Sequence, residues 1–430
     1  MHRVAMISYH TCPLAVLGGK DTGGMNVYVR ELTRTLGEAG VHVDIFTRSQ
    51  DEHVPHVLHD LGYGNRVVHI PAGPEHPLPK QDLARFLPEF VDGIVRFSRD
   101  KGIQYDMVHS HYWMSALAGA DLKKSWGVPM VTMFHTLGLM KNRVARSESE
   151  MEGAYRVQGE MQAIQASDRV IAATLAERAQ LELLYHMDAR KIVIIPPGVD
   201  TSRFYPISQD EAKIVVGIPA QDRMVLFVGR IEPLKGIDTL IQAMALVRQD
   251  CERDLCPHYL VIIGGDPDAS PERMTFEMAR LKQLCAELNL GELVVFLGKR
   301  GQDTLPYYYS AAEVLVMPSH YESFGMVALE AMACGTPVVA SQVGGLAFLV
   351  KDGETGFLVP DDDPQILSER LRALMRDSDL RRRMGAQASA LAVGYAWHNI
   401  TGRVRVLYDQ LTGLTQPGQA PPEPDWLGIA

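Results

Sequence analysis

Short runs of apolar residues alternate with longer amphipathic stretches along most of this chain. A continuous apolar run of about four to eight residues is typical of a buried strand, whereas apolar positions three and four apart are typical of a helix. In the first half this pattern predicts strands at Val4–Ser8, Val41–Thr47, Val67–Pro71, Met107–Ser110, Met130–Phe134, Arg169–Ala172 and Ile192–Ile195, with helices such as Val27–Ala39, Pro88–Lys101 and Leu175–Leu184 between them. Alternation of this kind predicts parallel βαβ units.

The same pattern restarts after a rigid segment at Pro196–Asp200, which contains two adjacent prolines and a glycine. The strands predicted beyond it are Met224–Gly229, Tyr259–Gly264, Val294–Leu297, Val314–Pro318 and Pro337–Ala340. We therefore predict an α/β fold with two Rossmann-like lobes, residues 1–198 and 199–394, that face a central cleft. The end of the chain, residues 413–430, is rich in Pro, Gly and Glu and is predicted to be disordered.

Composition narrows the class of protein. With 430 residues and 46% hydrophobic content, the chain can form two or three domains with substantial cores. It carries 42 Lys and Arg against 52 Asp and Glu, a net charge of -10. Nucleic-acid phosphates select basic surfaces, so this balance argues against a nucleic-acid partner.

The cysteines and the apolar runs predict a cytoplasmic location. The five cysteines are scattered and odd in number, which is typical of reduced thiols. Cys251 and Cys256 lack a second pair of ligands nearby, so we do not predict a zinc site. No apolar run reaches membrane-spanning length, and the first residues lack the long apolar stretch of a signal peptide.

The segment Glu322–Glu330 offers the clearest candidate chemistry. Two carboxylates frame a turn that opens into a predicted helix beginning near Phe324, whose free N–H groups would attract an anion. Glu330 lies about two turns further on and would reach a different part of the same ligand. A phosphate at the helix mouth with two flanking acceptors for sugar hydroxyls describes a nucleotide-sugar site, whereas the alternative is a solvated surface helix.

A second segment, Gly229–Gly236, follows a predicted strand and carries Arg230 and Lys235. Departure of a nucleoside diphosphate builds negative charge on its phosphate, and fixed cations there stabilise the transition state. The alternative interpretation is a loop with two exposed charges. This interpretation is less favoured once the segment is considered together with Glu322 and Glu330.

Three strand ends in the first lobe also carry candidate residues. Gly23 and Gly24 allow a ligand to approach the backbone, although their spacing is not that of a dinucleotide fingerprint. His109 and His111 lie at the end of one predicted strand and His135 follows the next. Without a suitably spaced acidic partner, these histidines do not predict a metal site, and a buried structural role remains the alternative.

Taken together, several motifs resemble the retaining glycosyltransferases of the two-Rossmann-lobe (GT-B) architecture, the large family that includes sucrose-phosphate synthases. Those motifs are Gly229–Gly236, Glu322–Glu330 and Ala333–Pro337. Within that family the chain looks most like the D-inositol 3-phosphate glycosyltransferases of mycothiol synthesis, in the segments His10–Leu14, Gly23–Val29, His109–Trp113, Pro196–Asp200 and Val343–Gly345. The resemblance covers about residues 1–412.

The resemblance implies a donor site for a UDP-sugar. Arg230 and Lys235 would hold the diphosphate, Glu330 the ribose and Glu322 the transferred sugar. The full implied donor set is Gly24, Arg230, Lys235, Lys299, Arg300, Glu322, Phe324, Gly325, Met326 and Glu330, with backbone near Lys299 and Arg300 on the uracil.

An acceptor site and the catalytic residues follow from the same resemblance. The implied acceptor set is Asn26, Lys80, Tyr112, Thr136 and Arg156, which would hold a sugar or polyol phosphate, and the implied catalytic set is Lys235, Arg230, Glu322 and His111. The family also implies that the last helix, residues 395–412, packs back on the first lobe. No tightly bound cofactor and no metal site are predicted, and the sequence leaves open whether Mg²⁺ assists and whether the chain forms a homodimer.

Three functions remain open at this point. The first is transfer of N-acetylglucosamine to 1D-myo-inositol 3-phosphate, favoured by Met25, where sucrose-phosphate synthases usually have glutamine. The second is transfer of glucose to fructose 6-phosphate, because Ile262–Asp266 and Ser147–Tyr155 depart from the mycothiol enzymes. The third class is an NDP-sugar epimerase or a non-catalytic sugar-phosphate-binding protein.

Overall fold

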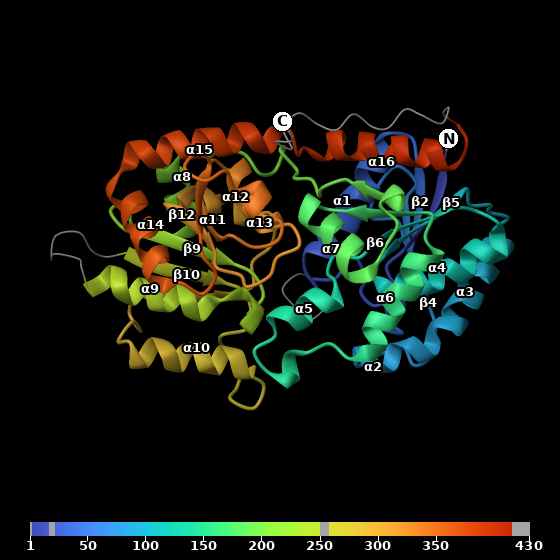
Figure 1. The fold of residues 1–430 in the computed structure, drawn as a ribbon, viewed down its shortest axis with the longest axis horizontal. Coiled ribbons are helices and arrows are strands. Elements are labelled where there is room, and N and C mark those ends of the chain that lie inside the picture. Colours follow the sequence, from blue (N-terminus) through green and yellow to red (C-terminus); the bar gives the residue numbers. More distant parts are fainter. Residues whose placement is uncertain (1, 17–21, 250–257, 415–430) are drawn as a thin grey trace. The chain divides into compact units, whose positions relative to one another are not determined.

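The computed structural model describes residues 2–16, 22–249 and 258–414, and it divides into two compact units (Figure 1). Unit 1 contains residues 2–16, 22–197 and 397–414, and unit 2 contains residues 198–249 and 258–396. Cys251, Cys256 and residues 415–430 of the predicted tail lie outside the described residues. Within the described part of the chain, no helix is both long and apolar enough to span a membrane.

Unit 1 is built on an eight-stranded sheet with the order β3-β4-β2-β1-β5-β6-β7-β8. Its strands are β1 (Arg3–Ile7), β2 (His42–Arg48), β3 (Val57–Leu58), β4 (Arg66–Ile70), β5 (Met107–His111), β6 (Met130–Met133), β7 (Arg169–Ala172) and β8 (Ile192–Ile194). All neighbouring strands pair in parallel except β3, which runs antiparallel to β4. The carboxyl ends of β1, β5 and β6 therefore lie side by side at one edge of the sheet.

The helices of unit 1 include one from the far end of the chain. They are α1 (Gly24–Glu38), α2 (Lys80–Leu83), α3 (Leu87–Asp100), α4 (Trp113–Trp126), α5 (Gly138–Val144), α6 (Ala154–Ala166), α7 (Leu175–Tyr185) and α16 (Trp397–Leu411). Figure 1 shows α16, in red, beside α1, and the two helices pack together. The Thr401 hydroxyl lies 2.5 Å from that of Thr35, and the Tyr408 hydroxyl lies 2.7 Å from Nδ1 of His109. These buried contacts attach the last helix to the first unit.

Unit 2 contains a six-stranded parallel sheet with the order β11-β10-β9-β12-β13-β14. Its strands are β9 (Arg223–Val228), β10 (His258–Ile263), β11 (Val294–Gly298), β12 (Val314–Met317), β13 (Val338–Ser341) and β14 (Gly356–Val359). Its helices are α8 (Gln209–Val216), α9 (Ile237–Gln249), α10 (Phe276–Glu287), α11 (Leu305–Ala311), α12 (Met326–Ala333), α13 (Leu346–Leu349), α14 (Pro364–Arg376) and α15 (Ser378–Val393).

Each unit has its own apolar core. In unit 1, Phe46 of β2 and Val108 of β5 are fully buried in the same cluster as Phe90 of α3. In unit 2, Leu260 and Ile262 of β10 are buried in a second cluster. Strands covered on both faces need apolar side chains on both faces, which is why they read as continuous apolar runs in the sequence.

The predicted α/β fold with two Rossmann-like sheets is confirmed, and every strand listed above from the sequence is present, with ends that agree to within one residue. Two strands were missed: β3 has only two residues, and β14 is a short edge strand that begins at Gly356. The helix predicted to begin near Phe324 begins two residues later. The helix begins at Met326, because the backbone of Gly325 has φ +103°, a left-handed conformation that a helix cannot include.

Candidate active site

In unit 2, the candidate donor residues follow the carboxyl ends of two adjacent strands, β9 and β12. Lys235 ends a short 3₁₀ helix, Pro233–Lys235, after β9, and Glu322 lies in the loop after β12. The Lys235 ammonium donates a hydrogen bond to Oε2 of Glu322 at 2.5 Å. The two side chains are only 14% and 17% exposed. Lys235, predicted to bind the diphosphate, and Glu322, predicted to bind the hydroxyls of the transferred sugar, are therefore in direct contact and partly shielded from water.

Arg230 occupies a more open position in the same loop. Its guanidinium donates to Oε1 of Glu232 at 2.7 Å, and the two side chains are 35% and 32% exposed. Ion pairs at this level of exposure contribute little to stability. The Arg230–Glu232 pair is therefore expected to contribute little to the stability of this loop.

Glycines let the two loops approach each other more closely than other residues would. Gly236 has φ +61°, and a Cβ built on it would lie 2.0 Å from the carbonyl oxygen of Pro318. Gly344 has φ +45°, and its Cβ would lie 2.0 Å from the carbonyl oxygen of Glu322, while the Gly345 N–H donates to that same oxygen at 2.8 Å. Gly236 therefore fixes the backbone next to Lys235, and Gly344 and Gly345, in the loop after β13, fix the backbone at Glu322.

Glu330 lies deeper, on α12, and is 6% exposed. Its Oε2 accepts a hydrogen bond from the Tyr309 hydroxyl at 2.8 Å, and its Oε1 accepts from the side-chain amide of Gln302 at 3.4 Å. Burial, followed by the nearby Glu330 charge, raises the pKa of Tyr309 well above its ordinary value, so this hydroxyl stays a donor. These two contacts orient the carboxylate predicted to bind the ribose.

The remaining predicted donor residues occupy two loops of unit 2 and the start of α1. Lys299 and Arg300 follow β11, and the Arg300 guanidinium donates to the Lys299 carbonyl at 2.9 Å and to the Tyr308 hydroxyl at 3.2 Å. Phe324 is buried beside Tyr395, with ring centroids 5.9 Å apart, and precedes the turn at Gly325 and the first helical residue, Met326. Gly24 is the first residue of α1 in unit 1.

In unit 1, three histidines gather at the carboxyl ends of β5 and β6, where His109 and His111 are buried and His135 is half-buried. The His111 and His135 rings are joined by an Nδ1–Nε2 contact of 3.0 Å, and the His109 and His111 ring centroids are 4.4 Å apart. Burial lowers the pKa of His109 and of His135 to about 3 and that of His111 well below its ordinary value. The three rings are therefore neutral at pH 7, and Nε2 of His111 is buried with no hydrogen-bond partner in the described structure.

Tyr112, directly after β5, lies at the centre of the predicted acceptor residues. Its ring lies 5.1 Å from the Arg156 guanidinium carbon and 5.8 Å from the Lys80 ammonium, and its centroid is 4.5 Å from that of His10. Tyr112 has φ +78°, an uncommon backbone conformation for a residue with a side chain. Such strain is concentrated at functional sites, and here it directs the tyrosine toward two cations.

Arg156, on α6, is held by three groups at once. Its guanidinium donates to the Thr136 hydroxyl at 2.9 Å, to Oε1 of Glu160 at 3.0 Å and to Oε1 of Glu152 at 2.5 Å. The structure thus brings Lys80, Tyr112, Thr136 and Arg156 into one cluster. Glu152 and Glu160 were not predicted from the sequence, because carboxylates four residues either side of an arginine are also typical of any helix surface.

Asn26, the fifth predicted acceptor residue, is buried and holds its own loop. Its side-chain amide donates to the Thr11 hydroxyl and to the Cys12 carbonyl, both at 2.8 Å, and its side-chain oxygen accepts from the N–H of Gly23 at 2.9 Å. Asn26 thereby ties the start of α1 to the loop after β1.

The candidate metal ligands and the thiols of the described part of the chain are dispersed. Three Asp-x-Asp spacings occur, at Asp266–Asp268, Asp361–Asp363 and Asp377–Asp379. Within residues 2–16, 22–249 and 258–414, no group of three or more His, Cys, Asp or Glu side chains is arranged to hold a metal ion. Cys12, Cys285 and Cys334 are free thiols.

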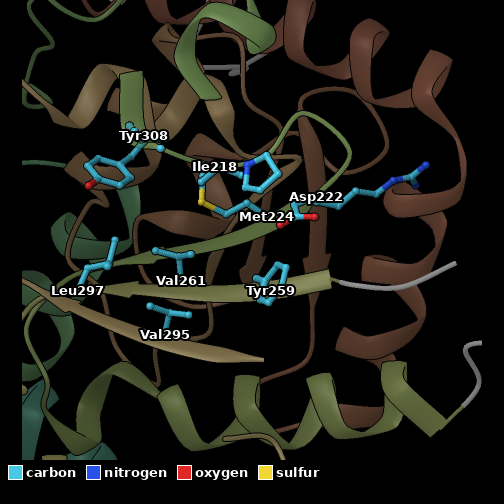
Figure 2. A pocket seen from close by; sticks show the side chains of 12 residues that line it. Ile218, Asp222, Met224, Tyr259, Val261, Val295, Leu297 and Tyr308 are labelled. Carbon is cyan, nitrogen blue, oxygen red and sulfur yellow. The ribbon is translucent and has the colours of Figure 1, made fainter. Parts of the chain in front are cut away.

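A separate apolar cavity of about 240 Å³ lies in unit 2. Figure 2 shows Val261 and Val295 on neighbouring strands below Ile218 and Met224. Its lining also includes Tyr308, whose hydroxyl accepts a hydrogen bond from Arg300. Aliphatic and aromatic side chains make up most of this lining, so the cavity differs in chemistry from the charged candidate site.

Comparison with known proteins identifies the family. Residues 208–390 match the family model described as Glycosyl transferases group 1, and residues 22–203 match that of Glycosyltransferase Family 4. The chain is 40% identical over 413 residues to the D-inositol 3-phosphate glycosyltransferase of Actinosynnema mirum, covering 95% of this chain and 97% of the relative. It is 42% identical over 408 residues to the enzyme of that name from Kineococcus radiotolerans, covering 92% of each chain.

Solved structures give the same result. The sucrose-phosphate synthase from Thermosynechococcus elongatus is 35% identical, with a TM-score of 0.87 over 96% of this chain and 100% of that one. An Anabaena protein, HepE, solved in complex with UDP and glucose, is 19% identical with a TM-score of 0.72 over 96% of this chain and 100% of that one, which supports the fold alone. The chain is therefore an enzyme of the GT-B fold and belongs to the glycosyltransferase family that contains the D-inositol 3-phosphate glycosyltransferases.

Proposed function

We propose that this enzyme is a retaining glycosyltransferase that moves a sugar from a UDP-sugar to a small phosphorylated acceptor. The first candidate reaction is transfer of N-acetylglucosamine to 1D-myo-inositol 3-phosphate. The proposal rests on one cluster of unit 1, beside the carboxyl ends of β5 and β6. It brings together two cations and two hydroxyl-bearing side chains, those of Lys80, Arg156, Tyr112 and Thr136. Such a set suits a phosphate monoester better than a neutral sugar.

On the donor side, we assign the diphosphate to Arg230 and Lys235. When the bond between the sugar C1 and the phosphate oxygen breaks, negative charge grows on the phosphate, and these cations neutralise it. Their charge supports a reaction that does not require a metal. Glu322 would release Lys235 and accept hydrogen bonds from the sugar hydroxyls, and Glu330, oriented by Tyr309, would accept from the ribose.

We propose that transfer proceeds by return on the same face of the sugar. The acceptor hydroxyl oxygen bonds to C1 on the face that the phosphate leaves, and its proton passes to the departing phosphate oxygen. The buried, neutral His111 would lie against the transferred sugar and donate or accept a hydrogen bond through Nε2. Because the ring is neutral, it adds no positive charge that would compete with Arg230 and Lys235 for the diphosphate.

A second candidate acceptor is fructose 6-phosphate, with UDP-glucose as donor. The specific observation that favours it is the 35% identity and the TM-score of 0.87 to a sucrose-phosphate synthase. Against it stand the relatives at about 40% identity over nearly the whole chain, whose names specify inositol 3-phosphate. We place the reaction in the cytoplasm, where the free thiols of Cys12, Cys285 and Cys334 would stay reduced.

A crossed assay tests these proposals. UDP-N-acetylglucosamine and UDP-glucose are each incubated with inositol 3-phosphate, fructose 6-phosphate, their unphosphorylated forms, or no acceptor. We expect rapid transfer from UDP-N-acetylglucosamine to inositol 3-phosphate and slow transfer to inositol. Equal rates with phosphorylated and unphosphorylated acceptors would contradict the assignment of the cation cluster, and conversion of the donor without acceptor would favour an epimerase.

A further inference from the structure

Glu152 places a carboxylate among the cations that the proposed function assigns to the acceptor phosphate. Its Oε1 accepts a hydrogen bond from Nη1 of Arg156 at 2.5 Å and a second from the Lys141 ammonium. Burial alone would raise the pKa of Glu152, but the charges of Arg156, Lys141 and Lys80 lower it below its ordinary value. Glu152 is therefore an anion that sits among three cations, two of which are proposed phosphate ligands.

The second carboxylate on Arg156 differs in how firmly it is held. Glu160 is fully buried and accepts from the N–H of Gly138 at 2.9 and 3.1 Å, as well as from the Tyr185 hydroxyl. It therefore orients the arginine permanently from one side. Glu152 lies before the start of α6, and its side chain is 20% exposed, whereas that of Arg156 is 2% exposed.

The backbone at Glu152 is fixed even though its side chain reaches the surface. The Glu152 N–H donates to the side-chain oxygen of Asn142 at 2.6 Å, and the Asn142 amide donates back to the Glu152 carbonyl at 3.1 Å. Rotation of the side chain alone can therefore move the carboxylate off Arg156 without unfolding the segment between α5 and α6. Rotation about side-chain bonds is fast compared with local unfolding.

We propose, on the basis of the acceptor chemistry assigned above, that Glu152 is an internal competitor for the acceptor phosphate. In the empty site its carboxylate holds Arg156 and Lys141, and the incoming phosphate displaces it and takes both cations. Two anions cannot share one guanidinium N–H, and their mutual repulsion opposes joint occupancy. Lys141 thereby becomes an additional phosphate ligand, and Glu152 a specificity-determining residue.

The competition sets a charge threshold for the acceptor. A neutral hydroxyl or a single carboxylate gains no more from Arg156 and Lys141 than Glu152 already does. A phosphate monoester carries a charge of about −1.5 to −2 at neutral pH and has three strong acceptor oxygens, so it can replace the carboxylate with a net gain. Glu152 would thus reject acceptors that lack the phosphate at little cost to the phosphorylated one.

The test compares Glu152→Gln with the wild-type protein by calorimetric titration with inorganic phosphate. Glutamine keeps the size of the side chain and removes its charge, so we expect the Kd for phosphate to fall about tenfold, with a matching fall in KM for the phosphorylated acceptor and an unchanged kcat. Glu150→Gln is the matched control, because its carboxylate accepts from Arg146 and Ser147 in the neighbouring turn. Its Kd should stay at the wild-type value.

The outcomes separate this inference from the proposed function. An unchanged or higher Kd in Glu152→Gln, with the preference for phosphorylated acceptors intact, would overturn the inference and show that Glu152 only orients Arg156. Adding Lys141→Gln to Glu152→Gln should remove most of the gain, and retention of the full gain would refute the role of Lys141. Equal turnover of both acceptor forms by the wild-type enzyme would instead contradict the proposed function.

Discussion

The two candidate phosphate sites both pair arginine or lysine with glutamate, but these pairs differ in their exposure to solvent. In unit 1, Arg156 is 2% exposed and is held by two carboxylates, whereas in unit 2 Arg230 and Glu232 are about one-third exposed and Lys235 and Glu322 lie between these extremes. A buried, oriented cation favours selective binding of one stable group. The cations of unit 2 would act on charge that develops as the diphosphate departs, and water excluded by the bound donor would strengthen their effect. We therefore assign acceptor recognition to unit 1 and donor activation to unit 2.

The largest test of this comparison is Lys235→Ala in unit 2. Because its charge matters most as the diphosphate departs, we expect kcat to fall on the order of a hundredfold or more, while KM for the acceptor changes little. Steady-state kinetics with both substrates measure the two effects. A near-normal kcat would show that the diphosphate does not lie at Lys235.

The matching change in unit 1 is Lys80→Ala. The Lys80 ammonium lies 5.8 Å from the Tyr112 ring centroid, within the acceptor cluster. Since a stable phosphate is bound about equally in the ground and transition states, KM for the phosphorylated acceptor should rise about tenfold with little change in kcat. The unphosphorylated acceptor serves as the control, and an equal rise in its KM would mean that Lys80 acts on the fold of the site.

This contrast also explains which parts of the molecule the sequence could predict. Buried parallel strands have a strong local signal, so the strands that precede Arg230, Glu322 and Tyr112 were found to within one residue at each end. The glycine-rich motifs were recognised, but the sequence did not show why glycine is needed there. A Cβ built at Gly236 or at Gly344 would lie 2.0 Å from a backbone carbonyl oxygen of another loop, which is far away in the sequence.

The partners of the charged residues were the part that sequence could not supply. The bond from Lys235 to Glu322 joins residues 87 positions apart, and no local pattern encodes it. Glu152 was missed although it lies in Ser147–Tyr155, a segment already singled out from the sequence. The sequence shows that a carboxylate is near an arginine, but only the three-dimensional contacts show whether it pairs with solvent, with the helix or with the site.

A third test sharpens the comparison within unit 2. Glu330 is buried against Tyr309 and Gln302, so Glu330→Gln removes charge while keeping the size of the side chain. Because a ribose contact is made equally before and during the reaction, we expect a several-fold rise in KM for the donor and a kcat within about twofold of the wild-type value. Thermal unfolding is the control for folding. A large loss of kcat with unchanged donor KM would place Glu330 at the reacting atoms instead.

The last test concerns the response of unit 1 to acid, which is measured as stability and not as turnover. Burial lowers the pKa of His109 and of His135 to about 3, below the value near 6.5 expected in an unfolded chain. The unfolded state therefore binds more protons between these values, and the stability of unit 1 should fall as pH drops below about 6.5, by roughly 1 kcal/mol per histidine and pH unit. In unit 2, His258 has a pKa lowered to about 4 by burial and by two arginines, so a smaller acid response is expected there.

Tryptophan fluorescence can follow this acid response in unit 1. Among the described residues all tryptophans, Trp113, Trp126 and Trp397, belong to unit 1. Urea unfolding monitored by this signal at pH 7 and pH 5.5 should show the loss, and His135→Asn should reduce it, since asparagine tolerates the φ of +62° at that position and does not titrate. The same pH dependence in His135→Asn and in the wild-type protein would mean that other groups control the acid sensitivity, and that the neutral histidines are not what distinguishes unit 1 from unit 2.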